Sequence, residues 1–208
     1  MCKFFSFIVR KPTSQSPIDF LYQWWTDSHS EIMNSYGLID GDRFRSNHAK
    51  IEFSPTKDGE LDRDWLDCSN WYLTVDEPTK PDWWTEDVEK SARQFAEMII
   101  KRATVTDKRY ALMEGFWILG GKAAVQKIGG GARVMMVRDS ATISYVGGSA
   151  TISDVGGSAT ISYVGDSATI SYVRGSATIT KVGTDPWDKP KITDNRVKPE
   201  APASGGGA

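Results

Sequence analysis

The stretch SATISYVGGSATISDVGGSATISYVGD, residues 140–166, repeats one nine-residue phrase three times. Weaker copies continue the same pattern on both sides of it, so that eight copies cover residues 113–184. The copies begin at Met113, Lys122, Gly131, Ser140, Ser149, Ser158, Ser167 and Ser176. A fixed short period is typical of architectures in which each repeat packs only on its neighbours.

Three apolar positions recur in every copy and predict how the chain turns. Position two is Ala in all copies but the first, position four is Phe, Val or Ile, and position seven is Leu, Ile or Val. Positions two and four share one face of a strand, whereas position seven requires a bend after position four and another at positions eight and nine, where glycine tolerates positive φ. Nine extended residues span about 30 Å, too short a perimeter for two walls about 10 Å apart. We therefore predict a short β-solenoid, a parallel β-helix with two nonapeptides per 18-residue coil.

Residues 18 apart should then stack in adjacent coils. This register predicts one surface column of Lys127, Tyr145, Tyr163 and Lys181 and another of Ile118, Met136, Asp154 and Tyr172. It also predicts outward threonine ladders, which β-propensity and side-chain hydrogen bonding explain better than an ice-binding surface does. Calcium-binding nonapeptides need a regular Gly/Asp ligand pattern, and Asp139 and Asp166 are too sparse to supply it.

Residues 1–112 show no such period and predict a small α+β domain. Strands are expected at KFFSFIVR, AKIEF and NWYLTVD, and a short helix should begin after Ser28, with Glu31 completing a capping box, and end at Gly37. A longer amphipathic helix is expected from about Thr85 to Arg102. Residues 185–208, rich in Pro and Gly, should form a cap, with Trp187 closing the last coil, followed by a disordered tail.

Composition narrows the class of protein. The 208 residues carry a net charge of −2, which argues against nucleic acid as the partner. No apolar run is long enough to span a bilayer, and the first residues lack a secretory signal pattern, so we expect a cytoplasmic protein. Two cysteines and two histidines without zinc-site spacing predict neither a disulfide framework nor a metal site, and no cofactor motif is present.

Aromatic and basic side chains of the N-terminal domain are the candidate ligand-binding residues. Tryptophan beside arginine suits stacking on a base and pairing with phosphate, although ordinary core packing is the competing interpretation. His29, in the segment DSHSE with Asp27 and Glu31, could bind metal or transfer protons, but helix capping already accounts for its neighbours. The candidates are Trp24, Trp25, His29, Arg43, Arg45, Trp71, Trp83 and Trp84, and the solenoid surface adds Tyr145, Tyr163 and Tyr172.

The opening MCKFFSF, the segment DSHSEI and the SATISYVGG-like nonapeptides resemble small phage and prophage proteins in which an N-terminal domain precedes a variable number of such repeats. The resemblance transfers no catalytic residue. It implies a phage accessory protein in the host cytosol, and interference with host defence is the expected role. The first hypothesis is a non-enzymatic binder of a host protein or of a small nucleotide-like signal. The second is a structural or oligomerisation module with the solenoid as a spacer, and the third is a hydrolase that uses Cys2 or His29.

Overall fold

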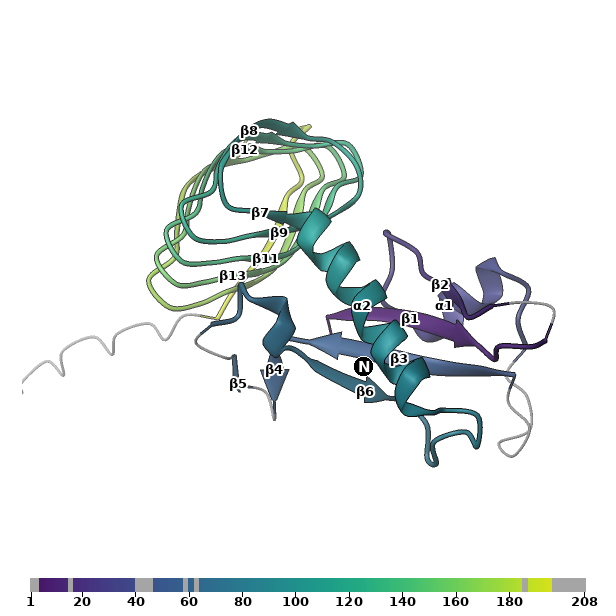
Figure 1. Ribbon diagram of the computed structural model, residues 1–208. Helices are drawn as coiled ribbons and strands as arrows, with labels where there is room; N and C mark the ends of the chain where they lie inside the picture. Colours follow the sequence, from purple (N-terminus) through teal and green to yellow (C-terminus); the bar gives the residue numbers. More distant parts are fainter. Residues whose placement is uncertain are drawn as a thin grey trace, which may run out of the picture. The chain divides into compact units, whose positions relative to one another are not determined.

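The computed structural model describes residues 4–14, 17–39, 47–57, 60–61, 64–184 and 187–195 (Figure 1). The chain forms two compact units, one of Met1–Val105 with Glu114–Gly120 and one of Thr106–Met113 with Gly121–Ala208. Each unit is described by itself below.

The N-terminal unit is built on a four-stranded antiparallel sheet of order β2-β1-β3-β6. The three strands expected from the sequence are present, and β2 forms within the apolar segment that follows the first of them. The unit contains β1 (Phe5–Arg10), β2 (Asp19–Leu21), α1 (His29–Ser35), β3 (His48–Ser54), β4 (Thr56–Lys57), β5 (Glu60–Leu61), a 3-10 turn (Cys68–Asn70), β6 (Tyr72–Val75), α2 (Glu86–Ala103), β7 (Thr104–Val105) and β9 (Phe116–Leu119).

Both helices are present where the sequence predicts them, but the capping box at Ser28 is incomplete, because the N–H of Ser28 donates to Oγ1 of Thr26 rather than to Glu31. The hydroxyl of Ser28 accepts the N–H of Glu31 at the start of α1, and Gly37 follows that helix with a φ of +65°. Thr85 caps α2 in the same way by accepting the N–H of Val88. One face of α2 is buried and lies across the sheet in Figure 1, and the stacked rings of Phe20 and Phe95 (4.6 Å between centroids) belong to this packing.

The solenoid makes about five turns between residues 104 and 194. Within the second unit its even-numbered strands form one parallel sheet of order β16-β14-β12-β10-β8, and β17-β15-β13-β11 form another. The strands are β8 (Lys108–Leu112), β10 (Ala124–Ile128), β11 (Arg133–Val137), β12 (Thr142–Val146), β13 (Thr151–Val155), β14 (Thr160–Val164), β15 (Thr169–Val173), β16 (Thr178–Val182) and β17 (Lys191–Asp194). The predicted four coils of residues 113–184 are therefore extended at both ends by strands that do not carry the repeated phrase.

The predicted stacking of every second copy is confirmed. Tyr145 pairs with Tyr163 in the adjacent coil, their rings stack with centroids 5.6 Å apart, and Lys127 and Lys181 continue the column on either side. Positions two, four and seven fill the interior, and most of these side chains are completely buried. The alanine column lets the walls approach closely, while branched residues fill the remaining space.

Positive φ is concentrated at position nine of the copies. Asp139 (φ 58°) and Asp166 (φ 52°) occupy this position in two copies, where most others have glycine. Their carboxylates accept the N–H groups of Gly121 and Gly148 in the preceding coil at 2.7 Å. The two aspartates therefore tie one corner of the solenoid to the next, which offsets the cost of a left-handed backbone conformation.

Two expectations for the C-terminal end were wrong. Residues Lys191–Asp194, predicted within the disordered tail, form β17, and residues 196–208 of that tail lie outside the described residues. Trp187 does not close the last coil, because 89% of its surface is exposed. The backbone near Trp187 pairs instead with the preceding coil: the N–H of Lys189 donates to the carbonyl of Asp166, and the N–H of Lys191 donates to that of Ala168. Among the described residues, no helix has the length and apolar character needed to cross a membrane.

Candidate functional site

A hollow of about 320 Å³ opens on the outer face of the first coils of the solenoid. Two small residues, Ala124 and Ser144, form its floor. In the outward column of position three, Ala124 stands where later coils carry Thr142 and Thr160, and Ser144 lies in the neighbouring outward column. The sheet is therefore recessed where β10 and β12 meet.

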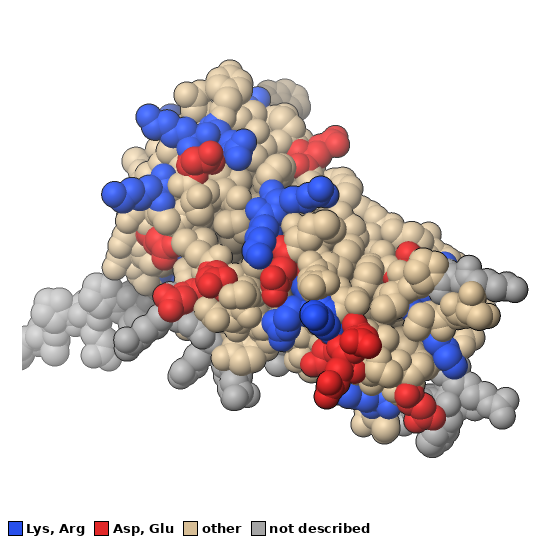
Figure 2. All heavy atoms as spheres, in the orientation of Figure 1, with Lys and Arg blue, Asp and Glu red and all other residues tan. Residues whose placement is uncertain are grey.

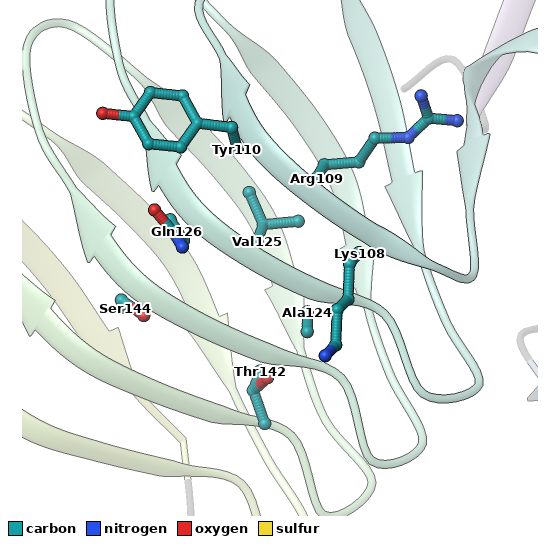
Figure 3. A pocket seen from close by; sticks show the side chains of 8 residues that line it. All are labelled: Lys108, Arg109, Tyr110, Ala124, Val125, Gln126, Thr142 and Ser144. Carbon is teal, nitrogen blue, oxygen red and sulfur yellow. The ribbon is translucent and has the colours of Figure 1, made fainter.

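Larger polar side chains from β8 and β10 surround this floor. Figure 3 shows Lys108 extending toward Thr142 on one side, with Tyr110 and Gln126 on the other. Tyr110 is 79% exposed, and its ring presents a free face to a ligand. Within the described residues, the side chains of Lys108, Tyr110 and Gln126 make no hydrogen bond or ion pair. The hollow thus combines an ammonium group, an aromatic ring and several hydroxyl and amide groups that have no partner in the described part of the chain.

Arg109 also lines the hollow, but unlike Lys108, Tyr110 and Gln126 it already has a protein partner. Its Nε lies 3.1 Å from Oδ1 of Asp107, and in Figure 3 its guanidinium extends away from the other lining residues. The backbone register places Arg109 beside the inward-facing Val125, so it stands at a core position in the terminal strand. A charged side chain there can reach water only because no coil of the described second unit follows on that side.

In the tyrosine column of the same sheet, Tyr145 and Tyr163 with Lys127 and Lys181, the side chains interact with one another and with nearby aspartates. The hydroxyl of Tyr145 donates to Asp166 and that of Tyr163 donates to Asp188, both at 2.8 Å, and the ammonium groups of Lys127 and Lys181 lie over the outer ring faces. The hydrogen bond to Asp166 is the main reason that the pKa of Tyr145 rises to about 12, with burial and the negative charge of Asp166 adding to it. These groups are satisfied within the protein, so the column stabilises the solenoid rather than offering a vacant site.

Charge on the described surface is mixed. In Figure 2, Lys and Arg side chains lie in small groups interspersed with Asp and Glu, and no extended patch of one sign covers the face shown. This distribution suits a ligand of limited charge better than a long polyanion.

The tryptophans predicted as ligand contacts have different environments. Trp24 and Trp25 are partly exposed on the loop after β2. Trp71 is buried, donates its indole N–H to the carbonyl of Trp65 at 2.7 Å and packs edge-on against Phe4, which is the environment of a core residue.

Trp83 and Trp84 lie next to each other before α2, with ring centroids 6.0 Å apart. The indole of Trp84 donates to Glu89, which also pairs with Lys80, and the two hydrogen bonds hold the pKa of Glu89 below its usual range. An open depression lies here with Arg93 at its edge. Lys80, Trp84, Glu89 and Arg93 are engaged with one another or with the backbone, whereas the side chains of Glu86 and Lys90 make no hydrogen bond or ion pair within the described residues.

His29 is the predicted candidate whose surroundings differ most from the sequence expectation. It is buried at the first position of α1, and its ring nitrogens contact Asp76 and the carbonyl of Ile51 rather than solvent. Arg43, Arg45 and Cys2 lie outside the described residues. Tyr172, predicted for the solenoid surface, is exposed, but the other members of its predicted surface column are buried, namely Ile118, Met136 and Asp154.

The residues of the hollow were not among the predicted candidates. Ala124 pairs with Lys108, 16 residues before it, and with Thr142, 18 residues after it. The first coil is therefore two residues shorter than the coil that follows it. A search at a period of nine cannot extend through that shorter coil. The usable signal is weaker: two basic residues and a tyrosine in the segment KRYAL, immediately before the first recognisable copy.

Comparison of the chain with protein-family models, with curated proteins and with solved structures found no match.

Proposed function

We propose that this protein is a non-enzymatic binding protein whose hollow on the first solenoid coils takes a small nucleotide-like anion. The observation that carries the proposal is the exposed ring of Tyr110 beside the ammonium group of Lys108, both without a protein partner among the described residues. A nucleotide base can stack on the face of a tyrosine ring. The ammonium group of a lysine on the same strand can then pair with the phosphate of that nucleotide.

The size and the chemistry of the hollow support binding over turnover. A volume of about 320 Å³ lies at the lower end of ligand pockets and has room for one nucleotide-sized molecule. Gln126, Thr142 and Ser144 supply neutral donors and acceptors that can read a base edge or a sugar. The described lining contains no carboxylate, imidazole or thiol that could act as a general base or nucleophile.

The biological setting remains the one that the sequence resemblance implies. A phage accessory protein in the host cytosol that sequesters a small nucleotide signal would weaken a host defence that depends on that signal. A solenoid suits this role because its stacked coils hold the backbone of the hollow on rigid strands. Binding therefore costs little conformational entropy of the protein.

The test uses the purified full-length chain with a panel of linear and cyclic mononucleotides in isothermal titration calorimetry. We expect one member to bind, and we expect Y110A and K108A each to weaken it by about tenfold or more, which corresponds to roughly 1.4 kcal/mol. The matched controls are Y172A and K181A, which remove an exposed tyrosine and a lysine of the same solenoid outside the hollow. Binding that is lost equally in the control variants, or no binding across the panel, contradicts the proposal.

A structural role is the second candidate, and one observation favours it. β16 and β17 are the outermost strands of their sheets at the C-terminal end, and Val182 is exposed on β16. An outermost strand can pair with a second copy of the chain. Light scattering separates the two functions: a concentration-dependent oligomer that binds no panel member supports the spacer role, and a monomer that binds one supports the ligand role.

A further inference from the structure

His29, Glu52 and Asp76 form a cluster in the N-terminal unit that the proposed function does not use. One nitrogen of His29 and one carboxylate oxygen from each acidic residue lie within 4.8 Å of one another. The three residues come from the start of α1, the middle of β3 and the position directly after β6. We propose that this cluster is a site for a divalent transition-metal ion of the Zn²⁺ class.

The hydrogen bonding of the imidazole decides which nitrogen is available. Nε2 of His29 lies 3.0 Å from the backbone oxygen of Ile51, and because a carbonyl only accepts, Nε2 carries a hydrogen. In the neutral ring, Nδ1 therefore holds the lone pair, and it faces Oδ2 of Asp76 at 3.2 Å. Metal-binding histidines typically show this arrangement, with the distal N–H donated to a carbonyl and the other nitrogen directed at the ion.

The distances fit a shared cation. Zinc bonds of about 2.0–2.1 Å in a tetrahedral site separate two ligand atoms by about 3.3 Å, close to the 3.2 Å between Nδ1 of His29 and Oδ2 of Asp76. The side chain of Asp76 is 55% exposed, whereas His29 is 5% exposed. A metal ion here would be held from the protein interior and would keep a coordination position open to water.

A second observation on the same face points to a missing partner. Ser6 pairs with Glu52 across β1 and β3, and cross-strand partners project to the same side of a sheet. Ser6 is 1% exposed, and its Oγ has no hydrogen-bond partner among the described residues. A buried hydroxyl without a partner is costly, and a water molecule bound to the metal could supply the missing bond.

One imidazole and two carboxylates select the class of metal. Imidazole nitrogen favours Zn²⁺, Co²⁺ or Fe²⁺ over Ca²⁺ and Mg²⁺, which prefer all-oxygen sites. Carboxylate ligands without thiolate argue against Cu⁺. The alternative occupant is a proton, which would make His29 an imidazolium ion-paired with Asp76, and the experiment must distinguish the two.

The experiment titrates Zn²⁺ into untagged, chelator-treated full-length protein by calorimetry at neutral pH. We expect one ion per chain, with affinity reduced about tenfold or more in E52Q and in D76N, because each substitution removes one charged ligand at nearly constant shape. The matched controls E86Q and D82N change exposed acidic residues outside the cluster and should bind as the unmodified chain does. Circular dichroism verifies that all variants are folded.

A nitrogen-15 spectrum of the histidine rings gives a readout that needs no variant. On addition of Zn²⁺, the Nδ1 resonance of His29 should shift while Nε2 keeps its hydrogen. Overturning results are the absence of stoichiometric binding, an affinity unchanged by E52Q and D76N, or a His29 ring that carries hydrogen on both nitrogens and does not respond to Zn²⁺. The nucleotide panel can fail without affecting these measurements, so the two proposals are tested separately.

Discussion

Replacing Asp154 by alanine should destabilise the solenoid by about 2–4 kcal/mol. Asp154 stands where most other copies of the repeated phrase have tyrosine or lysine, and its carboxylate lies between two arginines. Arg138 contacts one carboxylate oxygen, and Nε of Arg174 lies 2.5 Å from the other. Both arginines occupy position eight of their copies, where most copies have glycine. Three departures from the repeat therefore meet in one ion-pair cluster.

The magnitude follows from how far each partner is buried. The side chains of Asp154 and Arg138 are 11% and 16% exposed, whereas that of Arg174 is 57% exposed. Removing one partner of a buried pair costs about 3–5 kcal/mol because the other charge loses its compensation, while an exposed pair contributes about 0–1 kcal/mol. D154A leaves Arg138 uncompensated and should approach the lower part of the first range. R174A should cost less than about 1 kcal/mol.

The assay is urea unfolding followed by far-UV circular dichroism, with the midpoint and the slope compared between variants. D154Y restores the repeated phrase at one position but keeps both arginines, and we expect it to be about as destabilised as D154A. The triple variant R138G/D154Y/R174G restores the phrase at all three positions and should recover most of the loss, because replacing a whole buried ion cluster is often neutral. A D154A midpoint equal to that of the unmodified chain, or a triple variant weaker than D154Y, would refute the reasoning.

Three further predictions concern the solenoid. The pKa of Tyr145 is raised from 10.0 to about 12, so the native state holds this proton more tightly than the unfolded chain, and the resulting stabilisation is complete below pH 10 and lost between pH 10 and 12; D166N should return the phenol titration, followed by absorbance, toward pH 10. Deleting the two copies 158–175 should leave β17 in its present sheet, because one whole coil is removed. Deleting the single copy 158–166 should move β17 to the opposite sheet, and the free energy of unfolding from thermal denaturation should fall by about 1 kcal/mol more than for the two-copy deletion. A150L places a larger side chain in a fully buried column and should cost about 1–3 kcal/mol, while the partly exposed T160V should change stability by less than about 0.5 kcal/mol in the same urea assay.

The solenoid could be predicted because its information is local and repeated. Each copy carries the same three inward positions, and the geometry of a strand leaves few ways to bury them, so the stacking of every second copy followed from the phrase alone. The two terminal strands could not be predicted in the same way. β8 belongs to a coil that is shorter than two copies of the phrase, and β17 contains KITD, which shares little with the phrase. Their place is set by pairing with the coil beside them rather than by their own sequence.

The candidate sites were harder to predict for two different physical reasons. Helix caps made α1 predictable, but the partners of His29 come from positions 52 and 76 in other elements, so proximity in sequence could suggest only Asp27 and Glu31. An argument from cysteine and histidine spacing does not detect a site of one histidine and two distant carboxylates. Trp71 illustrates the second reason. The sequence pattern around a tryptophan in a strand is the same whether its ring fills the core, as that of Trp71 does, or faces a ligand.

Departures from the repeated phrase carry the specific information of this solenoid. Asp139 and Asp166 depart from glycine and accept a backbone N–H in the preceding coil, and Asp154 departs from tyrosine and binds two arginines. Each of these aspartates therefore interacts with another residue of the protein, by a hydrogen bond or by an ion pair. The first coils also depart from the phrase, at Ala124 and Gln126, yet there the side chains of Lys108 and Tyr110 on β8 have no partner among the described residues. Polar groups held on rigid strands without a protein partner are what a ligand can use, which is why the hollow, rather than the tyrosine column, is the surface to test for binding.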